Sequence, residues 1–107
     1  MSQCVQQSIH HLHVLAESSG KTARNILREA NEELICALTE IFFNILQGTI
    51  VLSSPTARQF LRKKVKLLQI LASKPENIKL KRQQFVKHAP VLLSMVLPSI
   101  LAELNND

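Results

Sequence analysis

The sequence predicts an all-α fold, a compact bundle of five to six short helices around one core. Three observations lead to this prediction. Apolar residues recur at spacings of three and four, which is the period of an α-helix. Capping residues stand where several of these runs begin. The 107 residues include only two glycines and four prolines, and this leaves few residues for the tight turns of a β-sandwich.

The chain has the size and composition of one globular domain. It has 107 residues, of which 46 % are hydrophobic and 20 % are charged, values typical of a folded domain. We therefore treat residues 1–107 as a single helical domain, with residues 1–20 peripheral and residues 90–107 forming a hydrophobic C-terminal helix. The expected core consists of Leu34, Leu38, Ile41, Phe42, Ile45, Phe60, Leu61, Val65, Leu68 and Leu71.

Two helices are expected before residue 31. The first covers residues 4–17 and ends at Ser18-Ser19-Gly20. A short second helix starts at Thr22. The apolar residues that predict the two helices are, respectively, Val5, Ile9, Leu12 and Ala16, and then Ala23, Ile26, Leu27 and Ala30.

The third helix, over residues 32–47, carries the strongest periodic run and is expected at the centre of the core. Asn31 is a good N-cap, and Glu32 and Glu33 favour the positive end of the helix dipole. Gly48 stands where a helix-ending glycine belongs. The run consists of Leu34, Ile35, Leu38, Ile41, Phe42, Ile45 and Leu46.

A basic helix is expected from Ser54-Pro55 to Ser73, after a connector over residues 49–53. Serine caps such a start and proline suits the first helical position. One face carries Arg58, Arg62 and Lys66 at spacings of four. The other face is apolar and consists of Ala57, Phe60, Leu61, Val65, Leu67, Leu68 and Leu71.

Two more helices are expected after a turn over residues 73–77. Asn77 can cap a helix over residues 78–88, with Ile78, Leu80, Phe85 and Val86 as its apolar residues. The last segment, residues 90–105, is apolar around nearly its whole circumference, so it must be buried in protein, in a partner or at a membrane. Pro98 is expected to kink it or to split it after Val96 or Leu97.

Enzymatic chemistry finds no support in the sequence. No Gly-rich phosphate loop is present, and Glu32 and Glu33 are explained by the helix dipole. Cys36 stands beside Ile35 in the apolar run and is expected to be a buried, inert thiol. His10 and His13 could share a helix face near Cys4, but a four-ligand zinc set is missing. We expect no catalytic residue, no metal and no cofactor.

The two cysteines, Cys4 and Cys36, form no disulfide framework, and their context indicates a reduced, intracellular protein. The charge distribution is more informative about partners. Residues 1–57 carry three Lys or Arg against five Glu, residues 58–87 carry ten against one, and residues 88–107 carry only two acids. Such an asymmetry indicates a polyanionic partner.

The leading hypothesis is therefore a small basic protein that binds nucleic acid through phosphate contacts with little sequence specificity. The chain has no Tyr or Trp, which argues against a stacking platform for single strands. Lys63-Lys64-Val65-Lys66 fits a short nuclear-import pattern, so a nuclear location is expected. The predicted phosphate contacts are Arg58, Arg62, Lys63, Lys66, Lys79, Lys81, Arg82 and Lys87.

The alternative hypothesis is a membrane-active or partner-docking protein that works through its hydrophobic C-terminal segment. The basic helices would then anchor the protein to anionic lipid. A helical adaptor for another protein, or a homo-oligomer, is a further interpretation. The contact residues of the alternative are Val91, Leu92, Met95, Val96, Ile100 and Leu101.

The order of these segments resembles a family of small basic proteins encoded by Polinton/Maverick-type DNA elements and related adenovirus-like viruses. The resemblance covers roughly residues 24–102, although His88-Ala89 stands where the family often has paired glycines. It implies a viral or mobile-element protein, made with the particle and associated with packaged DNA or with membranes. The matching segments are residues 30–38, residues 44–48, the Ser54-Pro55 start, residues 71–74, residues 79–82 and the hydrophobic tail.

Overall fold

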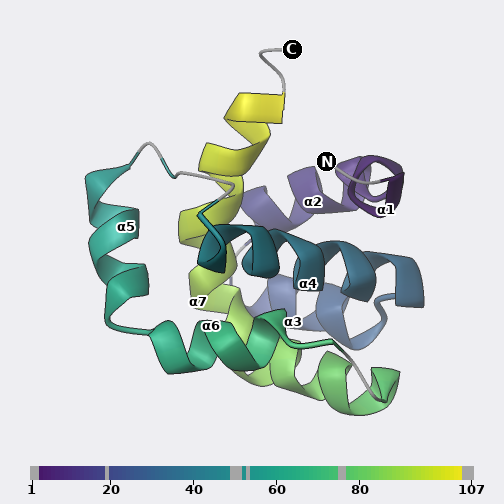
Figure 1. Ribbon diagram of the computed structural model, residues 1–107. Coiled ribbons are helices and arrows are strands. Elements are labelled where there is room, and N and C mark those ends of the chain that lie inside the picture. Colours follow the sequence, from purple (N-terminus) through teal and green to yellow (C-terminus); the bar gives the residue numbers. More distant parts are fainter. Residues whose placement is uncertain (1–2, 19, 49–51, 53, 75–76, 105–107) are drawn as a thin grey trace.

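The computed structural model describes residues 3–18, 20–48, 52, 54–74 and 77–104, without the side chains of residues 89–91, 103 and 104. These residues form helices and no strand, so the all-α prediction is confirmed (Figure 1). The helices are α1 (Gln3–Gln7), α2 (Ile9–Glu17), α3 (Gly20–Arg28), α4 (Glu32–Leu46), α5 (Pro55–Arg62), α6 (Val65–Ala72) and α7 (Ile78–Leu104).

Helix α4 forms as its sequence predicts. The Asn31 side chain accepts a hydrogen bond from the backbone N–H of Leu34 at 2.8 Å, which satisfies one of the unpaired donors of the first turn. Glu32 and Glu33 lie in that turn. At the other end Gly48 has φ +77°, a left-handed conformation that costs glycine little.

Helices α4 and α7 organise the packing. Helix α4 packs against α1 and α6, and α7 packs against α2 and α3. The rings of Phe42 on α4 and Phe85 on α7 join the two groups, with centroids 6.0 Å apart. The resulting body measures 32 × 29 × 26 Å. Helix α5 lies at one side of it and packs mainly against α6 (Figure 1).

Most of the expected core is buried. Ile45 and Phe60 are half-buried, whereas Val65 is exposed, so its assignment to the core is wrong. Cys36 is also exposed rather than buried, because it lies on the outward stripe of α4 with Glu33 and Glu40 and not on the apolar stripe. The expected core residues that are buried are Leu34, Leu38, Ile41, Phe42, Leu61, Leu68 and Leu71.

The predicted helix count of five to six is too low. The described residues form seven helices, or eight if the two arms of α7 are counted separately. The expected first helix is interrupted at Ser8, which is buried between α1 and α2. The expected basic helix is interrupted at Lys63-Lys64, so α5 and α6 are separate elements.

The N-terminal segment is not peripheral where the structure describes it. Val5 on α1 and Leu12 and Leu15 on α2 are fully buried. They pack into the same core as α4 and α7. The first two helices are therefore integral to the domain, because three large side chains would otherwise be left in water.

The expected C-terminal segment is the second arm of α7. The arms Ile78–His88 and Leu92–Ala102 meet at an angle of 99°. The predicted split at Pro98 is wrong, because α7 continues through this residue to Leu104. Pro98 is exposed and shares a stripe with the exposed Ala102, so water can reach the helix backbone on this side, where proline supplies no N–H.

Helix α5 begins at the predicted Ser-Pro start, and its cap provides a first test. The Ser54 hydroxyl accepts from the backbone N–H of Ala57 at 3.3 Å. We expect Ser54→Ala to destabilise α5 by about 1 kcal/mol. Because α5 packs mainly against α6, the loss should appear as local fraying, with amide exchange in residues 56–62 about fivefold faster.

The matched control for this cap is Thr56→Ala, at an exposed position of the same helix. It should leave exchange in α5 nearly unchanged. Equal acceleration in both variants would show that the Ser54 hydroxyl does not hold the start of α5.

Candidate nucleic-acid interface

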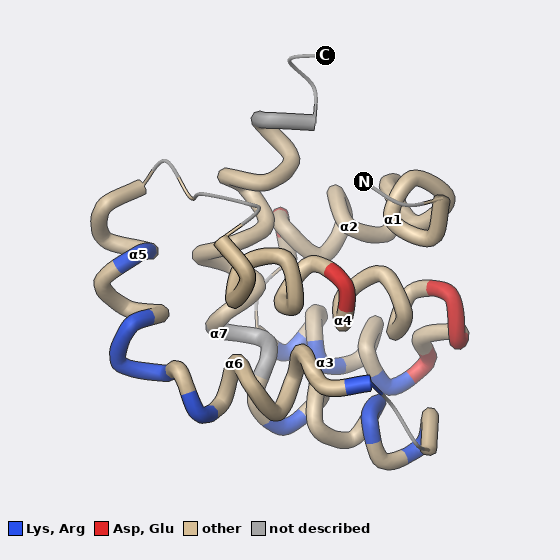
Figure 2. The backbone as a smooth tube through the Cα atoms, viewed as in Figure 1, with Lys and Arg blue, Asp and Glu red and all other residues tan. Residues whose placement is uncertain are grey.

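Basic residues gather along one edge of the molecule. Figure 2 shows Lys and Arg from α5, along α6, to the first arm of α7 and to α3, whereas the acidic positions of α4 lie above this edge. The charge segregation that the sequence predicts is therefore also a segregation in space. It places cations from three separate parts of the chain on a shared edge.

The predicted basic stripe does not lie on one helix. Arg58 and Arg62 belong to α5, but Lys66 belongs to α6, beyond the interruption at Lys63-Lys64. A single helix edge therefore cannot carry all three cations in a straight row. The residues of this region are exposed and are called here the α5–α6 cluster, which consists of Arg58, Arg62, Lys63, Lys64 and Lys66.

Lys81 is not a surface contact, contrary to the prediction. Its side chain is only 3 % exposed. The ammonium donates to the Ile70 carbonyl at 2.5 Å and to the Ser73 hydroxyl at 3.1 Å. It also lies 5.9 Å from the centroid of the Phe85 ring. Lys81 thus pairs with polar groups at the C-terminal end of α6 and links this end to α7. A helix C-terminus carries a partial negative charge and therefore favours a cation at this place.

Leu80 and Lys81 have exchanged their expected places. Leu80 is 59 % exposed, although it was expected on the apolar face. Position 81 follows Ile78 by three residues and precedes Phe85 by four, so it faces inward with them. The helical period therefore selects the lysine for the interior, and the hydrogen bonds to α6 compensate for its polarity.

The buried ammonium gives a stability prediction. Lys81→Ala should cost about 2 kcal/mol, because it removes hydrogen bonds to a charged group and leaves unfilled space. Lys81→Met keeps most of the volume and removes the desolvation cost, so it should be less destabilising. Urea unfolding of both variants measures the difference. A more damaging Met than Ala substitution would contradict this account.

The same group predicts a pH dependence. Burial lowers the pKa of Lys81 below its ordinary value of 10.5. Between the lowered pKa and 10.5 the unfolded chain binds more protons at this position than the native protein does. The free energy of unfolding of the wild type relative to Lys81→Met should therefore rise with pH in that window. A difference that stays constant up to pH 10.5 would contradict it.

The first arm of α7 and helix α3 together form a basic hollow. Its volume is about 360 Å³, and its lining also includes Gln83 and Val86 but, among the residues that the structure describes, no carboxylate. The N–H at Arg82 Nε donates to the Ala30 carbonyl at 3.0 Å, and Arg28 donates to Asn25 Oδ1 at 3.1 Å. We call this hollow the α3–α7 cradle. Its four cations are Arg28, Lys79, Arg82 and Lys87.

Arg28 is the cradle residue that sequence reasoning missed. It belongs to the N-terminal half, where acids outnumber bases. Only the packing of α3 against α7 brings it beside Lys79, Arg82 and Lys87. Its position in the last turn of α3 was a weak signal, since a helix C-terminus favours a cation whatever its function.

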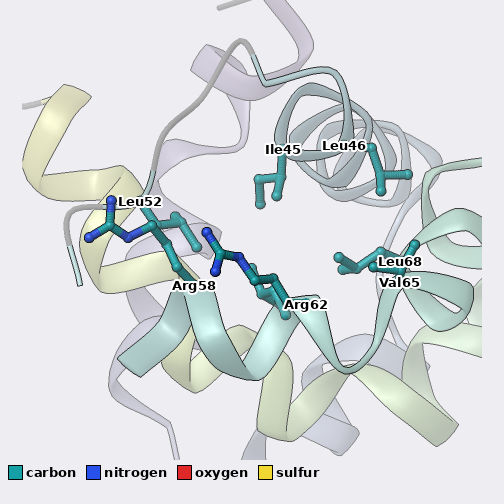
Figure 3. Close-up of a pocket in the computed structure, with 8 residues that line it drawn as sticks. Ile45, Leu46, Leu52, Arg58, Arg62, Val65 and Leu68 are labelled. Atoms are coloured by element: carbon teal, nitrogen blue, oxygen red, sulfur yellow. The ribbon is translucent and has the colours of Figure 1, made fainter. Parts of the chain in front are cut away.

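A second hollow, of about 260 Å³, adjoins the α5–α6 cluster. Ile45 and Leu46 at the end of α4 form one wall, and Val65 and Leu68 of α6 form another (Figure 3). The side chains of Arg58 and Arg62 rise from α5 at the Leu52 end of the hollow. The other residues that line this hollow are apolar, so Arg58 and Arg62 lie at its rim and do not form a group of cations around it.

The tail residues of the alternative hypothesis are mostly buried. Leu92, Val96, Ile100 and Leu101 belong to the core, and Met95 is half-buried. The side chain of Val91 lies outside the described residues. Within the described chain no single helix has the length and apolarity to span a bilayer; the two arms of α7 reach them only together, across their bend. Burial in the bundle argues against a free membrane or docking segment.

Comparisons with known proteins add no relatives. No family model, no curated protein and no solved structure matches this chain.

Proposed function

We propose that this protein binds nucleic acid through its phosphate backbone, without marked sequence specificity. The observation that supports the proposal best is the α3–α7 cradle, where four cations from two helices surround one hollow. Solubility alone does not require a group of cations, because a surface of mixed charge keeps a protein in solution equally well. A concave group of cations, with no carboxylate among the described residues that line it, instead favours a ligand of concentrated negative charge.

The chemistry of the cradle suits a phosphate. Arginine presents donors in a planar fork that matches phosphate oxygens, and lysine adds a compact positive charge. The N–H at Arg82 Nε is held by Ala30, but a guanidinium has five donors, so others can serve a ligand. Gln83 is the one uncharged polar side chain among the described residues that line the cradle. We propose that the four cations contact the phosphate backbone, and such contacts carry no sequence information.

The α5–α6 cluster extends the interface along the basic edge. Its five cations are exposed and lie on the edge that leads to the first arm of α7 (Figure 2). We propose that they contact phosphates further along the same nucleic acid. The resemblance to mobile-element and adenovirus-like proteins makes viral or element DNA in the nucleus the natural candidate.

A salt titration tests the proposal. With four to six phosphate contacts, the slope of log affinity against log salt should be about −4 to −5 for duplex DNA. Two duplexes of unrelated sequence should give equal affinities and equal slopes, because backbone contacts do not read bases. Strong preference for one sequence would contradict the proposed mode.

Vesicles provide the control ligand. Anionic and neutral vesicles should bind more weakly than duplex DNA at the same salt, because the apolar residues of the second arm of α7 are buried. Tight binding to anionic vesicles without binding to DNA at low salt would overturn the proposal and favour the membrane alternative.

A further inference from the structure

Cys4 and Cys36 are far apart in the sequence but meet where α1 packs on α4. The Cys4 thiol donates a hydrogen bond to the Glu33 carbonyl at 3.1 Å. Side chains on a helix lean toward its N-terminus, so the side chain of Cys36 covers the turn that contains Glu33. The Cys4 thiol is consequently placed beside Cys36, whose thiol contributes to the raised pKa of Cys4.

The two thiols have different environments. Cys36 is exposed, whereas Cys4 is half-buried. Burial raises the pKa of Cys4 to about 12, with smaller contributions from the Cys36 thiol and from the charges of Glu40 and Glu33. Since the thiolate is the nucleophile in thiol chemistry, Cys36 is the residue open to a reagent and Cys4 is a protected neighbour.

We propose that Cys36 and Cys4 form a thiol modification site, at which a small-molecule disulfide oxidises the pair to a disulfide that fastens α1 to α4. The Cys36 thiolate attacks one sulfur of the reagent, which forms a mixed disulfide and releases one thiolate. Cys4 then loses its proton and attacks Cys36 Sγ. The second thiolate leaves, so the protein loses two electrons and the reagent gains them.

The environment of Cys4 sets the pace of the second step. Once Cys36 carries the reagent, its thiol no longer raises the pKa of Cys4, but burial, Glu33 and Glu40 still do. Ring closure should therefore be slow at neutral pH and should accelerate with pH. Well below the pKa, the rate follows the thiolate fraction and rises roughly tenfold per pH unit.

The disulfide would constrain the chain strongly. It would close a loop that contains α2 and α3 and fix α1, whose only fully buried side chain is Val5. Closing a loop of this length removes entropy from the unfolded chain, which corresponds to a rise in Tm of about 10 °C. Neither cysteine lines the α3–α7 cradle, so the disulfide does not depend on nucleic-acid binding.

Intact-mass measurement of the full chain with glutathione disulfide tests the proposal. The wild type should pass through a glutathione adduct and end lighter by two hydrogen atoms. Cys4→Ser should stop at a stable adduct on Cys36. Cys36→Ser should remain almost unmodified, because Cys4 is half-buried and protonated.

A comparison with the unfolded chain shows whether the fold brings the thiols together. When each rate is divided by the fraction of Cys4 present as thiolate, closure of the wild-type adduct should be at least tenfold faster without denaturant than in concentrated urea. The division is needed because burial raises the pKa of Cys4 only in the folded protein. Equal rates, or a wild-type adduct as lasting as that of Cys4→Ser, would overturn the proposed pairing. An oxidised protein with an unchanged Tm would overturn the fastening of α1.

Discussion

Truncation of the chain before Pro90 is expected to unfold the protein. The second arm of α7 buries six large aliphatic side chains in the core, namely Leu92, Leu93, Val96, Leu97, Ile100 and Leu101. Each contributes about 1.5–3 kcal/mol when buried. Together they contribute about 9–18 kcal/mol, which is comparable to the roughly 5–15 kcal/mol by which a domain of this kind is stable. Circular dichroism and thermal unfolding of the truncated chain measure the effect.

A single substitution makes the same point without removing a helix. Leu97 is fully buried, and Leu97→Ala should cost about 2–5 kcal/mol in the free energy of unfolding. Ala102→Gln is the control, because Ala102 is exposed on the same arm; it should change stability by less than about 0.5 kcal/mol. A truncated chain with unchanged helicity and Tm would show that the arm is detachable and would revive the membrane alternative.

Helix α4 illustrates what local sequence can predict. Its cap, its acidic first turn and its final glycine are all local features, and its apolar residues keep one period throughout. The N-cap at Asn31 and the glycine at residue 48 therefore bound the same stretch that packs into the core, so the helix boundaries can be predicted from these residues. The starts at Ser54 and Asn77 are local in the same sense: the Asn77 side chain accepts from the N–H of Lys79 at 2.9 Å.

The break between α5 and α6 has no such local signal. Lys63 and Lys64 are ordinary helix formers, without a glycine or proline nearby in the run. The chain nevertheless changes direction there, with Lys64 at φ −117° and ψ 26°. The break lets α6 pack along α4 while α5 lies to the side, so its cause is tertiary packing, which no local pattern shows.

The sequence predicts that the candidate interface is basic, but it does not predict which basic residues belong to it. The excess of positive charge in residues 58–87 follows from counting. Lys81 is buried, and Arg28 of α3 lines the cradle; both positions depend on which helix faces pack together. A charge count assigns every basic residue to the surface, whereas the structure assigns one of them to the end of α6.

Removal of three cradle cations is expected to weaken DNA binding roughly a hundredfold. Arg28, Lys79 and Lys87 line the α3–α7 cradle and are exposed, so their replacement by Gln should leave helicity unchanged. At about 1 kcal/mol for each exposed contact, three contacts correspond to about two powers of ten in Kd. Arg82 is kept, because its bond to Ala30 also supports the packing of α7.

The matched control removes the same charge from residues of the same basic edge that belong to neither the α3–α7 cradle nor the α5–α6 cluster; two of them share α3 with Arg28. Lys21, Arg24 and Lys74 are exposed, and their replacement by Gln lowers the formal net charge from +5 to +2, as in the cradle variant. If phosphates lie in the cradle, the cradle variant should lose about three units of salt slope, whereas the control should lose less than one. Equal losses of salt slope in the two variants would show that net charge alone attracts the nucleic acid. A phosphate bound in the cradle should instead make the slope depend on the cradle cations and not on the control residues.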